Sequence, residues 1–405
     1  MKAIKAPLAL FDDLENIDNI NPSPIILSEH KQDYIQALSF LKSYKGSQGT
    51  FNSYRREIEK LLQWSWNVEN KPIKNLRREN IESFMFFSQN PPKSWIGTKK
   101  ATRFIVKNGL RVQNPEWRPF VATISKMAHR QGAKAHTKDF ELSSGSVKES
   151  FAILSSFYNY LLQEEYVFMN PVALIRQKSK FVRKRQGQQK IRRLTELQWT
   201  YIIETVTKMA ETDPKQHERT LFILSALYSM YLRISELAAS NRWIPTMNNF
   251  HRDQDGNWWF TTVSKGNKER QIAVSNAMLN ALKRWRLSLN LSPLPSPADT
   301  TPLLPKIKGK GPIASITYIR EIVQDCFDKA MNQLKKDGFL EEAESLIEAT
   351  VHWLRHTGIS EDVKHRPREH VRDDAGHSSG AITDKYIDIE LKERHRSAIN
   401  KPISN

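Results

Sequence analysis

A tract of basic residues near the middle of the chain places the strongest limit on how the chain can fold. Positions 176 to 193 hold nine lysines and arginines and no acidic residue: Arg176, Lys178, Lys180, Arg183, Lys184, Arg185, Lys190, Arg192 and Arg193. So many like charges without counter-charges do not enter a hydrophobic core. The tract therefore predicts a linker over 176–193. It would divide a domain over 29–175 from a domain over 194–405, with a loose leader over 1–28.

The linker has two interpretations. A charged segment is often only a solvated tether between domains. Its place between two helical regions of a basic protein favours a segment that lies along a phosphate backbone and adds affinity independent of base sequence. The nine basic residues are therefore predicted to contact a nucleic-acid backbone.

The whole chain shares this charge bias. It has 62 basic and 44 acidic residues, a formal net charge of +18 over 405 residues. Such an excess favours a polyanionic partner, and nucleic acid is the first candidate. An anionic membrane surface is the alternative, but no isolated basic amphipathic helix, lipidation signal or membrane span is evident. The lone Cys326 excludes an internal disulfide and is predicted to be a small buried apolar residue. With no signal peptide evident, we expect a cytoplasmic, nucleoid-associated protein.

The apolar periodicity predicts a mainly α fold with a small antiparallel β-sheet, an α+β protein. Helical spacing covers 34–41, 50–66 and 77–87, and a capping box at Ser146 opens a further helix. In the second domain a capping box at Thr195 opens a helix, and helical patterns cover 221–239, 275–289 and 316–337. Alternation over 258–263 and 270–274 predicts a β-hairpin, and 291–312 is proline-rich and predicted to be a loop.

A basic and aromatic segment over 93–120 has two interpretations. It combines Lys99, Lys100 and Arg103 with Trp95 and Trp117. Aromatic rings interleaved with cations suit contact with nucleic acid, so the three cations are candidate DNA contacts. An ordinary loop or hairpin would have the same composition, and the sequence does not decide between the two.

The stretch 351–387 holds residues suited to attack on a phosphodiester. It contains His352, Arg355, His377 and Tyr386, in the order H-x-x-R, then G-H-S-S, then a tyrosine nine residues after the histidine. An arginine neutralises a phosphate, imidazoles bond its oxygens, and a phenolic oxygen can act as the covalent nucleophile. This chemistry also needs a second arginine and a proton donor for the leaving oxygen. Arg233, within a helical apolar pattern, and Lys265, at the hairpin tip, are the candidates.

A zinc site is the alternative use of the histidines, since His352 and His356 are four residues apart. Trp353 stands where an H-E-x-x-H hydrolase has its glutamate base, and no cysteine or carboxylate cluster lies nearby. We therefore expect no metal. His356, His365 and His370 are predicted to serve packing or the surface.

The ordered motifs R-I-S-E-L, S-K-G-N-K-E-R, H-x-L-R-H-T and G-H-S-S with its tyrosine resemble the tyrosine recombinase (phage integrase) family. The likeness covers roughly residues 190 to 400, and the N-terminal helices are compatible with the core-binding domain of that family. Two positions depart from it. Tyr231 stands where the family often has a glycine, and Trp243 to Asn257 resembles an insertion. Lys268 lies on the same hairpin tip as Lys265, so the two lysines remain alternatives.

The resemblance implies a role for each residue. Arg233 and Arg355 would clamp the scissile phosphate. His352 would bond the phosphate or accept the tyrosine proton, and His377 would bond the same phosphate. Tyr386 would attack phosphorus and form a 3′-phosphotyrosyl link. Lys265 would protonate the leaving 5′-oxygen, and Glu236 would orient a neighbouring imidazole.

The resemblance also implies a whole-protein function: site-specific cleavage and rejoining of duplex DNA through a Holliday junction, without a cofactor, for integration or excision of a mobile element. The two domains would close as a C-shaped clamp on DNA, four subunits would assemble on it, and a directionality factor could take part. A type IB topoisomerase and a non-catalytic DNA-binding protein are the alternatives.

Overall fold

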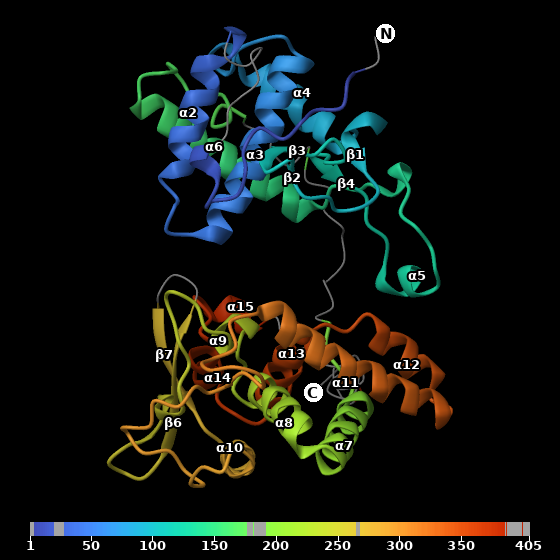
Figure 1. Cartoon of the computed structure of the whole chain (residues 1–405), viewed down its shortest axis with the longest axis vertical. Coiled ribbons are helices and arrows are strands. Elements are labelled where there is room, and N and C mark those ends of the chain that lie inside the picture. Colours follow the sequence, from blue (N-terminus) through green and yellow to red (C-terminus); the bar gives the residue numbers. More distant parts are fainter. Residues whose placement is uncertain are drawn as a thin grey trace, which may run out of the picture. The chain divides into compact units, whose positions relative to one another are not determined.

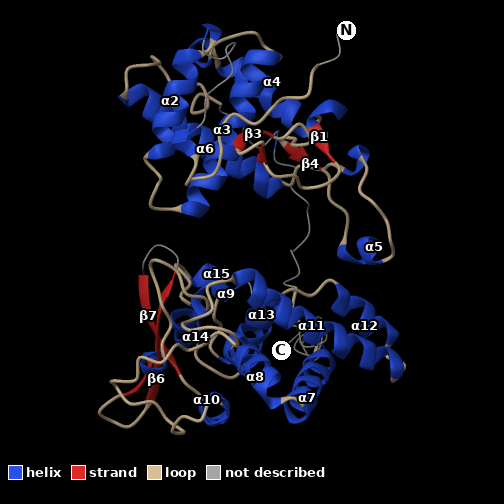
Figure 2. Ribbon diagram, viewed as in Figure 1, coloured by secondary structure: helices blue, strands red, loops and turns tan. Residues whose placement is uncertain are grey.

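A computed structural model describes residues 4–19, 28–175, 181, 192–264, 268–384, 386 and 399 (Figure 1). The chain forms two compact units, Met1–Gly187 and Gln188–Asn405. The boundary falls within 176–193, the tract predicted as a linker. The fold is mainly helical with small sheets (Figure 2), so the predicted α+β class is confirmed. None of the helices in the described part of the chain combines the length and the apolar character that a membrane crossing requires.

The first unit is a bundle of helices around a mixed aliphatic and aromatic core. Its helices are α2 (Lys31–Lys42), α3 (Gln48–Asn67), α4 (Arg78–Gln89), the short α5 (Lys126–Arg130) and α6 (Ser144–Gln163). The predicted helices over 34–41, 50–66 and 77–87 are confirmed. The predicted start of α6 is wrong: the helix begins two residues before Ser146, because the hydroxyl of Ser143 caps it by accepting a hydrogen bond from the Ser146 nitrogen at 3.1 Å.

A small β region lies between α4 and α6 in the chain. Strand β1 (Ile96–Gly97) pairs in parallel with β4 (Phe120–Val121), and β2 (Phe104–Lys107) pairs with β3 (Leu110–Gln113) as a hairpin. The segment over 93–120 is thus an ordered hairpin region. Trp95 and Trp117 are 0% and 5% exposed, so these rings serve packing and are not available for stacking on bases.

The N-terminal residues 4–19 are not the loose leader that the sequence predicts. Phe11 is fully buried, and the backbone nitrogens of Leu10 and Phe11 donate to the buried carboxylate of Glu59. Asp12 receives a bidentate pair from Arg111, at 2.5 and 2.7 Å. Buried apolar side chains and charge-assisted bonds hold the segment on α3 and β3, a long-range pairing that local composition does not reveal.

The second unit combines helices with one three-stranded antiparallel sheet. Its helices are α7 (Glu196–Thr212), α8 (Pro214–Ser229), α9 (Ile234–Leu237), α10 (Asn276–Ser288), α11 (Ile316–Lys336), α12 (Leu340–Ile347), α13 (Val351–Asp362), α14 (Arg368–Ala375) and α15 (Gly380–Asp384). Its strands are β5 (Phe250–Arg252), β6 (Trp258–Ser264) and β7 (Lys268–Ala273), in the order β5-β6-β7. The buried core holds Cys326, as predicted.

Most of the predicted elements of this unit are confirmed. Thr195 caps α7, since its hydroxyl accepts from the Gln198 nitrogen and its own nitrogen donates to the Gln198 side chain. The hairpin runs in register from Trp259 opposite Ala273 to Ser264 opposite Lys268. The proposed insertion over 243–257 contributes β5, a third strand that the sequence did not predict.

The continuous helix predicted over 221–239 is wrong. It is broken between α8 and α9 because Tyr231 has left-handed backbone, with φ of +49°. A β-carbon makes this conformation costly, so a tyrosine rarely adopts it. The break ends α8 and gives the chain a new direction just before Arg233.

Candidate active site

Helix α13 carries the candidate residues His352 and Arg355, together with His356, and packs closely against α8. The close approach depends on Gly358, because a β-carbon there would collide with the carbonyl oxygen of Tyr228. The buried side chains of α13 include Leu354 and Ile359. The H-x-L-R-H-T-G sequence thus combines site residues with the small residue that lets its helix approach a neighbour.

Arg355 is held by backbone oxygens from two separate segments. Its side chain is 2% exposed and donates hydrogen bonds to the carbonyls of Tyr231 and Ala375, the latter at 2.6 Å. Burial, with the charges of Arg233 and Arg270, lowers the pKa of Arg355 below its usual range. Several guanidinium groups gathered this closely favour an anion between them, such as a phosphate.

The conformation of Tyr231 directs its carbonyl to Arg355 and its phenol to α13. The phenolic oxygen bonds with Asp362 and accepts a hydrogen bond from Arg366 at 2.9 Å. Arg366 also donates to Asp374 on α14 at 2.6 Å. Position 231 is where the family that the sequence resembles often has a glycine. The left-handed backbone explains why a glycine suits it, and the hydrogen bonds show how a tyrosine is held there.

Arg233 caps α9 and shares the carboxylate of Glu236. The Arg233 backbone nitrogen donates to Glu236 at 2.8 Å, and its guanidinium lies 3.2 Å from the same carboxylate. Glu236 is 1% exposed and also accepts from Arg270 at 2.7 Å. These bonds orient two guanidinium groups, so they do not support the predicted role of Glu236 in orienting an imidazole.

Arg270 belongs to the site but was missed by the sequence analysis. It lies on β7, its side chain is 7% exposed, and its Nε and Nη1 atoms are buried without a hydrogen-bond partner within the described residues. It packs on Gly376, where an added β-carbon would stand 2.8 Å from its Nη1 atom. The sequence did contain a signal for Arg270. It is the arginine of the K-E-R motif and lies two residues before the buried Ile272, on the same face of the strand.

Tyr386 lies between two imidazoles. Its hydroxyl is 2.6 Å from the Nδ1 atom of His356, and its ring stacks on that of His377 at 5.7 Å between centroids. The Nδ1 atom of His377 is in turn 2.9 Å from the hydroxyl of Thr383. Tyr386 itself is only 7% exposed. His356, predicted to serve packing or the surface, is part-buried, and its ring contacts the tyrosine.

The three histidines are held in the neutral form. Partial desolvation, followed by the charges of Arg355 and Arg233, lowers the pKa of His352. Burial, followed by His352 and Arg355, lowers the pKa of His356 to about 4. Burial, followed by the charges of Arg355 and Arg233, lowers the pKa of His377 to about 4. At neutral pH all three rings can accept a hydrogen bond or a proton.

Burial and the nearby arginines act in opposite directions on the ionisation of the Tyr386 phenol. Burial raises the pKa of Tyr386, while the charges of Arg355 and Arg233 oppose this rise. The structure therefore brings Arg233, Arg355, His352, His377 and Tyr386 into one electrostatically coupled cluster, with Arg270 and His356 added. No group of three or more His, Cys, Asp or Glu side chains suited to a metal ion occurs within the residues that the structure describes.

Other predicted residues fall outside this cluster or outside the described residues. Lys265, and the linker residues from Arg176 to Lys190, are not among the described residues, whereas Lys268 and Arg192 are exposed and Arg193 is half-buried. Lys100 is exposed. Lys99 pairs with Glu116 at 2.9 Å.

Arg103 has a structural environment that argues against its predicted contact with DNA. Its guanidinium pairs with Glu59 and lies 4.8 Å from the ring centroid of Trp117. Its side chain is only 15% exposed.

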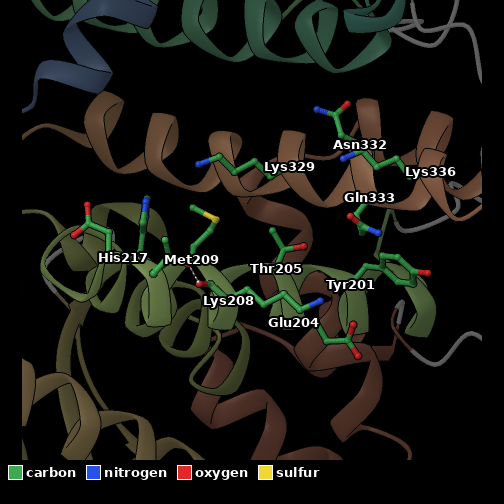
Figure 3. Close-up of a pocket in the computed structure, with 12 residues that line it drawn as sticks. Tyr201, Glu204, Thr205, Lys208, Met209, His217, Lys329, Asn332, Gln333 and Lys336 are labelled. Atoms are coloured by element: carbon green, nitrogen blue, oxygen red, sulfur yellow. Dashed lines mark hydrogen bonds between the residues drawn. The ribbon is translucent and has the colours of Figure 1, made fainter.

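A separate groove lies between α7 and α11. Side chains from both helices face each other across it, including Tyr201 and Lys208 from α7 and Lys329 and Lys336 from α11 (Figure 3). None of the cluster residues lines this groove.

Comparison with known proteins gives a consistent result. No family model matches the chain. It is 27% identical over 262 residues to the tyrosine recombinase XerC of Thermodesulfovibrio yellowstonii, which covers 62% of this chain and 73% of that protein. Among solved structures, the post-cleavage complex of the XerH site-specific recombinase on a palindromic difH substrate matches with a TM-score of 0.54. The identity is 14%, over 97% of this chain and 91% of that one. The Tn1549 transposon integrase in complex with a circular intermediate DNA matches with a TM-score of 0.51 and 14% identity, over 90% and 98%.

The cluster combines three arginines, three histidines and a tyrosine on a mainly helical unit. The structural matches support the fold alone. The ordered motifs and the similarity to XerC support the tyrosine recombinase family.

Proposed function

We propose that this protein is a site-specific DNA recombinase that cleaves and rejoins duplex DNA through a tyrosine-linked intermediate. One observation carries the proposal: the hydroxyl of Tyr386 lies 2.6 Å from an imidazole, in the same cluster as Arg233 and Arg355. A nucleophile, a proton acceptor and a group of cations are the components that attack on a phosphodiester requires.

In the proposed reaction, Arg233 and Arg355 bind the non-bridging oxygens of the scissile phosphate. The Tyr386 oxygen attacks phosphorus, the bond to the 5′-oxygen breaks, and a 3′-phosphotyrosyl link forms. Lys265 supplies the proton for the leaving 5′-oxygen, with Lys268 as the alternative donor. His352 and His377 bond the phosphate as charge develops on it. Because the phosphotyrosine keeps the energy of the broken bond, a second 5′-hydroxyl can reverse the step without a nucleotide cofactor.

The proposed partner is double-stranded DNA carrying a specific site. The XerH and Tn1549 structures that share the fold are complexes with DNA substrates. Exchange between two sites implies four subunits on the DNA and a Holliday-junction intermediate, with integration or excision of a mobile element as the biological role. A directionality factor is compatible with this role. The basic segment over 176–193 and the exposed Lys99 and Lys100 are proposed to contact the phosphate backbone, which places the protein at the nucleoid.

Covalent capture tests this function directly. The full chain is incubated with sheared DNA from the genome that encodes it, denatured, and the DNA attached to protein is recovered and sequenced. The expected result is one recurrent sequence attached by wild type and none by Tyr386→Phe. Absence of an adduct with wild type would refute an enzymatic function and leave a DNA-binding protein on the same fold.

Plasmid topology separates recombination from the type IB topoisomerase alternative. A supercoiled plasmid that carries two copies of the captured site should yield recombined circles. Relaxation of a plasmid without the site, and no recombination of the two-site plasmid, would favour the topoisomerase.

A further inference from the structure

The two histidines of α13 are not equivalent with respect to the nucleophile. His352 and His356 are one helical turn apart, and their ring centroids lie 4.2 Å apart in an edge-to-face arrangement. The hydrogen bond to the hydroxyl of Tyr386 is formed by His356, through Nδ1 at 2.6 Å. His352 is instead exposed, and the charges of Arg355 and Arg233 act on it.

We propose that His356, and not His352, accepts the phenolic proton of Tyr386 during DNA cleavage. This inference rests on the recombinase function proposed above and assigns one of its steps. The proton moves from the Tyr386 oxygen to Nδ1 of His356 as that oxygen bonds to phosphorus and the bond to the 5′-oxygen breaks. The leaving 5′-oxygen takes a separate proton from its own donor. In rejoining, the imidazolium returns its proton to the departing tyrosine oxygen.

The groups around His356 suit this role. The ring faces His352, Arg355, His377 and Tyr386, and burial with those neighbouring charges keeps it neutral in the absence of DNA. A neutral imidazole with its proton on Nε2 presents a lone pair at Nδ1, and a phenol with a raised pKa donates to it. In that tautomer the pair is arranged as O–H to N before the reaction begins.

Binding of the scissile phosphate would strengthen the base. Its negative charge between the arginines offsets their effect on the ring, and a nearby opposite charge raises the pKa of an imidazole. His356 would thus become a better proton acceptor only when DNA occupies the site. This coupling leaves the tyrosine protonated, and poorly nucleophilic, in the free protein.

The assignment also defines the role of His352. The sequence left open whether it bonds the phosphate or takes the tyrosine proton. With the hydroxyl bonded to His356, the exposed His352 ring beside Arg355 remains for a phosphate oxygen.

The test uses cleavage of a duplex built on the captured sequence and nicked near the cleavage point, so that the covalent complex accumulates. The variants are His356→Ala and His356→Asn, whose amide oxygen can accept a hydrogen bond but not a proton. His365→Ala is the matched control, since its side chain is 71% exposed. Thermal unfolding and gel-shift binding to the same duplex verify that each variant is folded and binds DNA.

Both His356 variants should form the covalent complex about 100-fold more slowly than wild type at pH 7, a typical effect of losing a general base. Their rates should rise about tenfold per pH unit towards pH 9, as free phenolate replaces base catalysis, while wild type and the control stay nearly flat. Added imidazole should accelerate His356→Ala. A wild-type rate in His356→Asn, or a pH-independent loss in both variants, would overturn the assignment in favour of positioning. If wild type itself formed no covalent complex, the recombinase function would fail and this step with it.

Discussion

Replacing Gly358 by alanine tests how closely the position of α13 is set. A β-carbon there would overlap the Tyr228 carbonyl oxygen and stand 3.1 Å from the carbonyl carbon and 3.2 Å from Cδ1 of Tyr231. The main obstacle is backbone, which cannot rotate away as the end of a long side chain can. To restore ordinary contact, α13 must withdraw from α8 by roughly 1 Å.

The two opposing energies can be compared. Overpacking of a filled site costs about 1–3 kcal/mol. The higher helix propensity of alanine returns about 1 kcal/mol. The steric cost should dominate because backbone must move, and the net loss is about 1–2 kcal/mol. For a unit of this size that corresponds to a fall in Tm of roughly 2–8 °C.

The assay is thermal unfolding of the full chain by differential scanning calorimetry. Gly380→Ala in the same unit is the control, since nothing lies within 4 Å of its added β-carbon. Gly358→Ala should also slow covalent complex formation, because Arg355 and His356 move with the helix. A Tm at or above that of wild type would refute the close packing described for α13.

Two further predictions concern charge in the catalytic unit. Arg270→Met should raise the pKa of His377 above about 4, because the Arg270 charge contributes to lowering it. NMR titration of the ring measures this, Arg252→Met on β5 should leave it unchanged, and an unaltered pKa in Arg270→Met would contradict the coupling. Separately, this unit should lose stability as pH falls from 6.5 to 4. The pKa values of His356 and His377 are lower in the folded than in the unfolded protein. Below pH 6.5 the unfolded state therefore binds more protons, and the free energy of unfolding falls. The fall in Tm over this range should shrink in His377→Gln.

The sequence predicted most of the catalytic unit because its signals are local. Capping at Thr195, alternation in the hairpin and helical spacing in α10 and α11 each depend on neighbours in the chain. The order of the motifs then identified Arg233, Arg355, His352, His377 and Tyr386 as one set, and the structure brings them together.

What the sequence missed depends on contacts between distant residues. Residues 4–19 are held on α3 because Glu59, about fifty positions away, accepts hydrogen bonds from the backbone of Leu10 and Phe11. Arg270 enters the site only because Gly376 leaves room for it. His356 reads as a packing residue until its ring is seen beside Tyr386, 30 positions later. Pattern analysis along one chain does not detect such pairings.

The left-handed turn at Tyr231 has a mechanical consequence. The residue lies two positions before Arg233, and its carbonyl accepts from Arg355, so one peptide sets the separation of two guanidinium groups that are distant in the chain. Its phenolic oxygen bonds with Asp362, the last residue of α13, and with Arg366 just beyond that helix. A displacement of that helix end would therefore shift the guanidinium groups of Arg233 and Arg355 at once, whereas a glycine at this turn would have no side chain through which to transmit the movement.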